Sequence, residues 1–349
     1  MATILLTKNP SLSGFQYSSI QDKFVSLVNE ATEFNIATGF VTNDSIATLQ
    51  QIVSYKGGRL KLNLFIGMHY IEGFTKIQYK AVKTLNEYLN EANVGNVYLS
   101  PSALYHGKMY SFLNNGRCLG SFVGSSNLGS FVGRDPNYIE ADALFDGDNG
   151  LFVNESISNV IRSLGKKMAD LPALTRFIEP ESRLLHSYHF VKEVGAEEVG
   201  RFEQCRTGEK AYIPLKTEPK SNLNTYFGAG KVKNKYSPRG WYEVELIIGK
   251  REPAVDKIPT DYPITVVTKD GYMFQCERQG DYFKNFRSRY DLKILGRWIK
   301  GQMENVGALE IGQPVTETVL QEFGRSKISL EETSIVDENG NKAWLISLE

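Results

Sequence analysis

The sequence has few of the residues that build disulfide frameworks or metal centres. Its 349 residues include three cysteines and four histidines. Cys118, Cys205 and Cys276 lie far apart and match no CxxC spacing, which argues against disulfides and thiolate metal sites. The low histidine count argues against a His-rich metal centre. We therefore expect no metal ion and no other cofactor.

Long apolar runs are also missing. No stretch approaches the ~20 apolar residues that a bilayer crossing requires. The first residues lack the basic start and apolar core of a signal peptide. With 41% hydrophobic and 23% charged residues, the composition is typical of a globular protein. We expect a cytoplasmic protein without membrane contact.

An overall excess of charge is absent, because 40 basic residues balance 40 acidic ones. The balance hides a local pattern. Residues 206–300 hold 19 basic and 11 acidic side chains, a net charge of +8. More acidic segments, 179–205 and 301–349, flank this block. Such a basic block favours a surface that faces phosphates. A solvated face that binds nothing is the alternative.

The length and the element pattern predict two domains. Short apolar runs at 35–41 and 60–68 are typical of buried strands. Between them, Asp44 is a candidate N-cap of a helix over 45–54 that ends at Gly57. The remaining pattern predicts helices over 74–92 and 151–168 and strands over 96–100, 108–113, 119–125 and 139–145. This alternation predicts a layered α/β domain over 1–178.

The second half has a different texture, beginning after the prolines of 172–183. Its one expected helix covers 288–304. Strand-like runs recur at 240–249, 262–270, 271–279, 328–333 and 343–349. Gly, Pro, Asn and Asp separate these runs, which predicts a mostly-β, barrel-like domain over 179–349.

The residues that carry chemistry gather between positions 105 and 140. His106 and Lys108 are two apart, so on a strand they point to the same face. A polar turn, GSSN, brings Ser126 and Asn127 close to them, and Glu140 opens the next strand. An imidazole can act as nucleophile or general acid, while an ammonium and a carboxamide hold charged oxygens. A carboxylate can orient the imidazole through its other nitrogen.

Each piece also has a plain structural explanation. An isolated HxK is usually a surface coincidence, and GSSN can be an ordinary turn. His69 follows the run at 60–68, where a loop histidine without a catalytic role is the favoured interpretation. The combination at close range is what favours phosphodiester chemistry.

HxK followed by GSxN resembles the signature of the phospholipase D superfamily. His106, Lys108, Gly124, Ser126 and Asn127 match this signature position by position. The usual motif has an aspartate five residues after the lysine, and this chain has Leu113 there. That difference, together with Glu140, resembles the metal-independent restriction endonucleases of the BfiI and NgoFVII type.

The resemblance implies a mechanism and an oligomer. Superfamily members bring two HxK motifs together, and this chain contains one; His186 and Lys192 have the wrong spacing. We therefore expect a homodimer, formed through the N-terminal domain, with one shared active site. One His106 forms a phosphohistidine and its twin protonates the leaving oxygen. Lys108 and Asn127 hold the phosphate with help from Ser126, and Glu140 orients the imidazole.

The basic block contains two segments, 231–243 and 276–289, that interleave Lys and Arg with aromatic and amide side chains. These groups bind phosphates and read base edges. The segment DYFKNFR and the late run from Gly307 to Glu332 resemble the pseudobarrel DNA-binding domain of plant auxin-response-type transcription factors and several restriction enzymes. The resemblance implies two arms, within 216–241 and 275–289, that grip the major groove of double-stranded DNA.

We predict groove contacts from Arg239, Lys284, Asn285 and Arg287, and phosphate contacts from Lys231, Lys233, Lys235 and Arg289. A dimerisation module with an incidentally basic rim is the alternative for this domain. For the whole chain, the sequence favours a type II site-specific endonuclease, which implies a cognate DNA methyltransferase. Two alternatives remain: a lipid-cleaving phospholipase D, and a DNA-binding regulator whose nuclease-like half is an inactive dimerisation domain.

Overall fold

The computed structural model describes residues 3–7, 18–131, 139–179, 190–218, 222–228, 239–248 and 255–349. The contacts divide them into two compact units. The first is formed by the described residues of Met1–Pro180 and Gly230–Trp241. The second is formed by the described residues of Glu181–Ala229 and Tyr242–Glu349.

The first unit is built on a nine-stranded mixed sheet with the order β2-β1-β8-β7-β6-β3-β4-β5-β9. Strands β3, β4 and β5 run parallel, and β6 pairs antiparallel with β3. The strand bounds are β1 Thr3–Leu6, β2 Ser18–Ser19, β3 Glu33–Thr38, β4 Lys61–Ile66, β5 Gly95–Leu99, β6 Lys108–Asn114, β7 Arg117–Gly124, β8 Ala141–Phe145 and β9 Lys166–Lys167.

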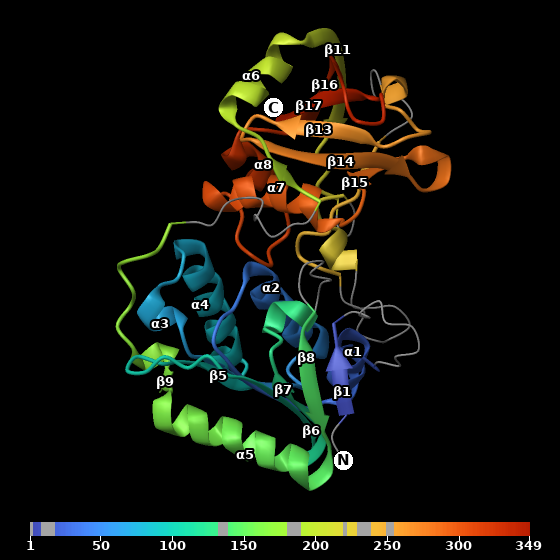
Figure 1. The fold of residues 1–349 in the computed structure, drawn as a ribbon. Helices are drawn as coiled ribbons and strands as arrows, with labels where there is room; N and C mark the ends of the chain where they lie inside the picture. Colours follow the sequence, from blue (N-terminus) through green and yellow to red (C-terminus); the bar gives the residue numbers. More distant parts are fainter. Residues whose placement is uncertain are drawn as a thin grey trace. The chain divides into compact units, whose positions relative to one another are not determined.

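Helices cover both faces of this sheet, as Figure 1 shows, with α5 on the side opposite α1, α2 and α4. Their bounds are α1 Ile20–Glu30, α2 Asn43–Lys56, α3 His69–Glu72, α4 Lys76–Glu91 and α5 Gly147–Leu164, with short 3-10 turns η1 Leu128–Phe131 and η2 Met168–Asp170.

Side-chain caps set where these helices begin. Thr42 forms a capping box with Ser45 at the start of α2, so the N-cap is Thr42 and the prediction of Asp44 is wrong. Thr75 and Gln78 form a second capping box before α4. Each box satisfies backbone N–H groups that a helix start leaves open. Gly57 ends α2 in the left-handed conformation, as predicted.

An aromatic core lies between the sheet and α1. Phe112 on β6 stacks on Phe34 of β3 with ring centroids 4.1 Å apart. Phe24 of α1 contacts both rings edge-on. Phe122 and Phe131 extend the cluster, and all five side chains are at most 1% exposed.

The opposite face is covered by α5, whose Val153 and Ile157 pack on Ala37 and Phe65. This helix begins at Gly147, four residues before the predicted start. It ends at Leu164, before the predicted end at 168. Gly150 permits close packing, because a Cβ there would lie 2.4 Å from Cys118 Sγ.

The second unit is a mostly-β domain around one curved sheet with the order β11-β16-β17-β13-β14-β15-β12, to which β10 adds by pairing with β14. The strand bounds are β10 Lys192–Glu193, β11 Arg206–Pro214, β12 Leu246–Ile247, β13 Ile264–Thr268, β14 Tyr272–Gln279, β15 Asn285–Ser288, β16 Lys327–Val336 and β17 Lys342–Leu348. The helices are α6 Ala196–Gln204, α7 Lys293–Asn305 and α8 Glu317–Phe323, with 3-10 turns η3 Thr225–Gly228, η4 Val255–Lys257 and η5 Asp281–Phe283.

The predicted helix over 288–304 begins too early. Residues 285–288 pair with β14 as β15, and the helix α7 follows from Lys293. Trp298 of α7 is buried and donates through Nε1 to Asp270 Oδ1 at 3.0 Å. The apolar residues whose spacing predicted the helix thus lie in α7 or at its N-cap, and only the start of the helix was predicted too early.

For the parts of the chain that the structure describes, no helix combines the length and the apolar character of a membrane span.

Replacing Phe112 tests the aromatic core. We expect Phe112→Ala to lower the free energy of opening of β3 and β6 by about 3–5 kcal/mol, because a buried ring is lost and a cavity remains. Native-state hydrogen exchange of these strands measures that free energy. Phe152→Ala is the control, since Phe152 is 70% exposed and its loss should change the value by less than about 0.5 kcal/mol. Equal effects of the two substitutions would contradict this account of the core.

Candidate functional site

The candidate site lies where two parallel strands, β3 and β4, end in glycine. Tyr105 and His106 cross over these ends at very short range. A Cβ on Gly67 would lie 2.3 Å from the Tyr105 carbonyl oxygen, and one on Gly39 would lie 3.1 Å from Cα and Cδ2 of His106. The Tyr105 N–H donates to the Gly67 carbonyl at 3.2 Å. Both glycines are thus needed for the approach, which fixes where His106 stands.

His106 and Lys108 are in direct contact, as their spacing predicted. Lys108 begins β6, where it pairs with Thr38 of β3. Its Nζ lies 3.1 Å from Nε2 and 3.4 Å from Nδ1 of His106, and it donates to the His106 carbonyl at 2.8 Å. His106 is exposed and its ring meets Phe40 edge-on. An exposed imidazole beside an ammonium can approach one phosphate group together with it.

Lys108 is a buried cation. Lys108 is only 9% exposed, and this burial lowers its pKa from the ordinary value of a lysine. The negative charge of Glu140 acts in the opposite direction and raises this pKa. An ammonium with little water around it interacts strongly with an incoming anion.

The turn at residues 124–127 is tied to β6 by Tyr110. This residue lies two positions after Lys108, and its phenol donates to the Ser126 carbonyl at 2.9 Å. The GSSN turn therefore lies beside the strand that carries Lys108, as predicted. Asn127 Oδ1 is buried and has no hydrogen-bond partner. Such an unpaired amide oxygen at the site calls for a ligand or water.

Asp142 is a site residue that the sequence analysis missed. It is 1% exposed, and its Oδ2 accepts a hydrogen bond from the buried Ser126 hydroxyl. Burial raises the pKa of Asp142, while the bond from Ser126 lowers it. Gly124 pairs with Asp142, and a Cβ there would lie 2.4 Å from Asp142 Oδ1. The Ser126 hydroxyl thus holds the turn by its bond to Asp142. Gly124, which has no Cβ, leaves room for the Asp142 carboxylate.

Glu140 is placed beside the same turn. Its Oε2 accepts a hydrogen bond from the Ser125 hydroxyl, and its backbone is hydrogen-bonded to Thr7, which follows β1. Among the residues that the structure describes, its side chain thus bonds to Ser125 rather than to His106. Its charge nonetheless reaches Lys108. The role of Glu140 as the orienter of the imidazole remains a prediction.

Two neighbouring positions are structural. Leu113, where the superfamily motif has aspartate, is 4% exposed in the apolar interior. His69 is buried; its Nδ1 lies 2.9 Å from the Gly73 carbonyl, and its Nε2 accepts from the Val41 N–H at 3.1 Å. Both ring nitrogens of His69 therefore have partners within the fold, and the residue begins α3 rather than lying in a loop.

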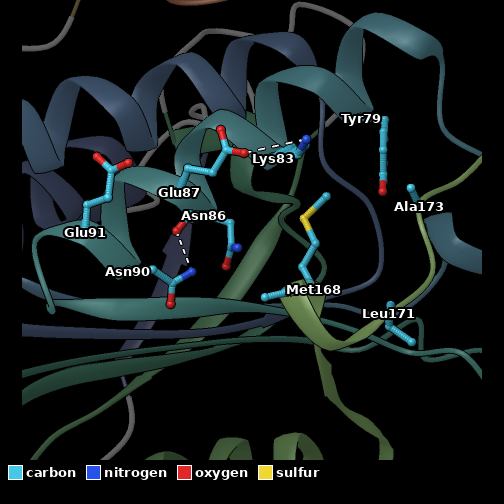
Figure 2. Close-up of a pocket in the computed structure, with 10 residues that line it drawn as sticks. Tyr79, Lys83, Asn86, Glu87, Asn90, Glu91, Met168, Leu171 and Ala173 are labelled. Carbon is cyan, nitrogen blue, oxygen red and sulfur yellow. Dashed lines mark hydrogen bonds and ion pairs between the residues drawn. The ribbon is translucent and has the colours of Figure 1, made fainter.

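A shallow pocket of the first unit lies elsewhere, between α4 and η2 (Figure 2). Its lining includes Tyr79, Asn86 and Met168, and its one lysine, Lys83, is paired with Glu87 at 3.6 Å. The lining has neither histidine nor cysteine, so it offers no nucleophile of the kind found around His106.

In the second unit, the hairpin of β14 and β15 brings amide, carboxylate and guanidinium side chains together. Glu277 lies opposite Arg287, and Gln279 lies opposite Asn285. Arg289 donates to Gln275 Oε1 at 3.2 Å. One face of a two-stranded ribbon thus carries amides and guanidinium groups, which are the groups that recognise base edges. Gln275, Gln279 and Glu277 were not predicted, because residues far apart in the sequence come together only through strand pairing.

The predicted DNA contacts have different surroundings. Arg287 is held by Glu245 at 3.4 Å and by Glu277 at 3.3 Å. Lys284 and Arg289 are exposed, whereas Asn285 and Arg239 are partly buried. Lys231, Lys233 and Lys235 lie outside the described residues, as does His186.

Several solved structures are similar in fold to about half of the chain. A phosphatidylserine synthase from Haemophilus influenzae is 16% identical over 48% of this chain and 40% of its own, with a TM-score of 0.36. This chain thus spans two-fifths of the synthase. Nuc, a phospholipase D family member from Salmonella typhimurium, is 14% identical over 48% of this chain and 97% of its own (TM-score 0.32). NucT from Helicobacter pylori is 17% identical over 47% of this chain and 98% of its own (TM-score 0.32).

No curated protein sequence matches the chain. Two family models match it, one after the other. Residues 18–170 match the NgoFVII restriction endonuclease N-terminal PLD domain, and residues 206–334 match the NgoFVII C-terminal B3-like DNA-binding domain. The predicted resemblance and both predicted fold classes are thereby confirmed. Because both halves of one architecture are present in order, this chain belongs to the NgoFVII family of restriction endonucleases, with a phospholipase D-type domain followed by a B3-like domain.

Proposed function

We propose that this chain is a type II restriction endonuclease that hydrolyses DNA phosphodiesters through a covalent phosphohistidine at an active site shared by two subunits. One observation carries the proposal: an exposed imidazole, His106, stands in contact with a buried ammonium, Lys108, beside the GSSN turn. The family match supplies the DNA context.

In the first step, an unprotonated nitrogen of His106 attacks phosphorus and forms a P–N bond. The bond from phosphorus to the leaving deoxyribose oxygen breaks, and His106 of the partner subunit gives that oxygen its proton. Lys108 and Asn127 hold the non-bridging oxygens, whose charge grows in the transition state. Asn127 would do so by donating from its amide Nδ2, because an amide oxygen can only accept hydrogen bonds.

In the second step, water attacks the phosphohistidine. The partner's His106, now neutral, takes a proton from this water, and the P–N bond breaks. Two imidazoles are needed and each chain supplies one, so the site is complete only in a homodimer formed by the first unit. Ser126 and Asp142 act as positioning residues, because they hold the turn that presents Asn127.

Metal independence is part of the proposal. A metal ion in nucleases offsets phosphate charge and activates water. In this chain Lys108 and Asn127 provide the positive and polar groups, and the histidine is itself the nucleophile.

We further propose that the hairpin of β14 and β15 forms one arm that binds the major groove, with Lys284, Asn285, Arg287 and Arg289 on it. Arg287 must exchange or share its carboxylate partners to reach a base. The other proposed arm contains Arg239, Lys231, Lys233 and Lys235. Restriction activity implies a cognate methyltransferase that protects host DNA, and cytoplasmic location.

Two other functions remain to be tested against this one. A lipid phosphodiesterase would use the same His106 and Lys108, but it would not need a B3-like domain. A DNA-binding regulator would keep that domain but would have an inactive first unit. Cleavage of DNA in the absence of metal separates the proposal from both.

The His106→Ala variant tests the nucleophile. The unaltered chain should cut plasmid DNA into discrete fragments in excess EDTA, and His106→Ala should lower the rate by a factor on the order of 10³ or more. Salt-dependent binding to duplex DNA should stay unchanged, because the variant leaves the second unit intact. Lys83→Ala, on the exposed face of α4, is the control and should cut normally. Cleavage that requires magnesium, or that survives in His106→Ala, would contradict the proposed chemistry.

Mixed dimers test the shared site. Subunits with different tags, one unaltered and one carrying His106→Ala, can be co-expressed and purified through both tags. The mixed dimer should be inactive, since each reaction needs two imidazoles. Independent sites would instead leave about half of the activity. A half-active mixed dimer, or a fully active monomer, would overturn the shared-site proposal.

The pH profile tests Lys108. Burial lowers the pKa of Lys108, and the charge of Glu140 raises it. Cleavage needs the ammonium form, so activity should fall as the pH rises through this pKa, at a lower pH than for an exposed lysine. Glu140→Gln removes the charge that raises the pKa and should move the alkaline fall to lower pH. Glu87→Gln, in an exposed helical pair, should leave it in place; a fall that stays or moves upward in Glu140→Gln would contradict the assignment.

A further inference from the structure

The turn between β14 and β15 presents two aromatic side chains to solvent. Tyr282 is 81% exposed and Phe283 is 48% exposed. Both residues have positive φ, 58° for Tyr282 and 53° for Phe283. Bulky side chains avoid this left-handed conformation, and such strain is concentrated at functional sites. A polar or glycine pair would form the same turn with less strain.

The strained turn is held in place by its neighbours. The Arg278 guanidinium donates to the Phe283 carbonyl at 2.9 Å and to the Ile258 carbonyl at 3.2 Å. The Phe283 N–H donates to the Gly280 carbonyl at 3.0 Å. Gly280 itself has φ of 77°, and a Cβ there would lie 3.0 Å from Asn285 Nδ2. The rings are thus presented from a fixed turn rather than from a loose loop, which lowers the entropy lost when they bind.

The surroundings indicate what these rings would meet. They stand at the end of the ribbon face that carries Gln279, Asn285 and Arg287, next to the exposed Lys284. Another aromatic residue of the same unit, Tyr290, is 52% exposed, and its ring stacks on Phe190 at 4.2 Å and lies under the Arg289 guanidinium. The two rings of Tyr282 and Phe283 thus form an apolar tip on a ribbon that also carries cationic and amide groups. Such a ribbon is complementary to an anionic groove that has apolar groups at its base.

We propose that Tyr282 and Phe283 contact the C5-methyl groups of thymines on the floor of the DNA major groove. The inference rests on the proposed DNA-binding function and adds a specificity determinant to it. The major groove admits a two-stranded ribbon, and the thymine methyl is the apolar group that a base pair presents there. The tip then reads A·T pairs by shape, while the amide and guanidinium groups behind it read polar base edges.

The experiment removes single methyl groups from DNA. The full chain carrying His106→Ala is first used to select its preferred duplex from random sequences. Each thymine of that duplex is then replaced by deoxyuridine. Pairing is kept and the methyl is lost. At one or two positions the replacement should weaken binding by about fourfold, the effect of one buried methyl-sized group. In a chain that also carries Tyr282→Ala and Phe283→Ala, the same replacement of thymine should have no effect on binding.

Two control variants separate loss of the ring contact from other effects of substitution. Tyr282→Gly removes the ring and suits the left-handed conformation, so it separates loss of the contact from strain in the turn. Val336→Ala alters another exposed apolar side chain of the same unit and should keep the full thymine dependence. Thermal unfolding of each variant shows that it is folded.

Three results would overturn the inference. Thymine replacements could weaken binding equally with and without the two rings, or have no effect at any position. A 2-aminopurine probe beside the sensitive position could also brighten on binding, which would mean that a ring enters the base stack instead of touching a methyl group. Failure to prefer any sequence would refute the proposed recognition function itself, and this outcome is visible in the selection before any thymine is replaced.

Discussion

The proposed catalytic arrangement depends on how closely residues 105–107 cross the ends of two parallel strands. Gly39 and Gly67 leave no room for a Cβ at this crossing. The peptide of Tyr105 therefore lies against the strand ends, and the chain turns into β6 with Lys108 opposite Thr38. Because β3 and β4 are buried parallel strands covered on both faces, their ends are a rigid platform. A catalytic group placed on such a platform keeps its geometry without paying for reorganisation during the reaction.

A second layer of contacts carries this geometry to the side chains that we propose bind phosphate. Tyr110 fixes the turn after β7 through the Ser126 carbonyl, and Asp142 fixes the same turn through the Ser126 hydroxyl. The result is a site whose cation, Lys108, is buried and whose acidic neighbour, Glu140, is turned toward Ser125. Burial makes the lysine responsive both to an anionic ligand and to nearby carboxylates. The electrostatics of the site thus follow from the packing of its strands.

Much of this was readable from the sequence, and the exceptions have physical reasons. His106, Lys108 and the GSSN turn were found because their chemistry and spacing are local. Asp142 was not found, since a lone aspartate in a strand acquires meaning only when pairing places it beside Ser126. Strand β15 was not predicted, because its four residues are too few to show a strand pattern, and its last residue was placed in the following helix. The ion pairs of Arg287 likewise join residues from three separate strands or loops.

The most direct test of the account is the stereochemistry at phosphorus. A duplex with a phosphorothioate of one configuration at the scissile position can be cleaved in ¹⁸O-labelled water, and the configuration of the product determined. Attack by His106 followed by attack of water is two in-line displacements, each of which inverts phosphorus, so the account predicts net retention. Net inversion would show that water attacks the DNA directly, and it would contradict the role of His106 as the nucleophile.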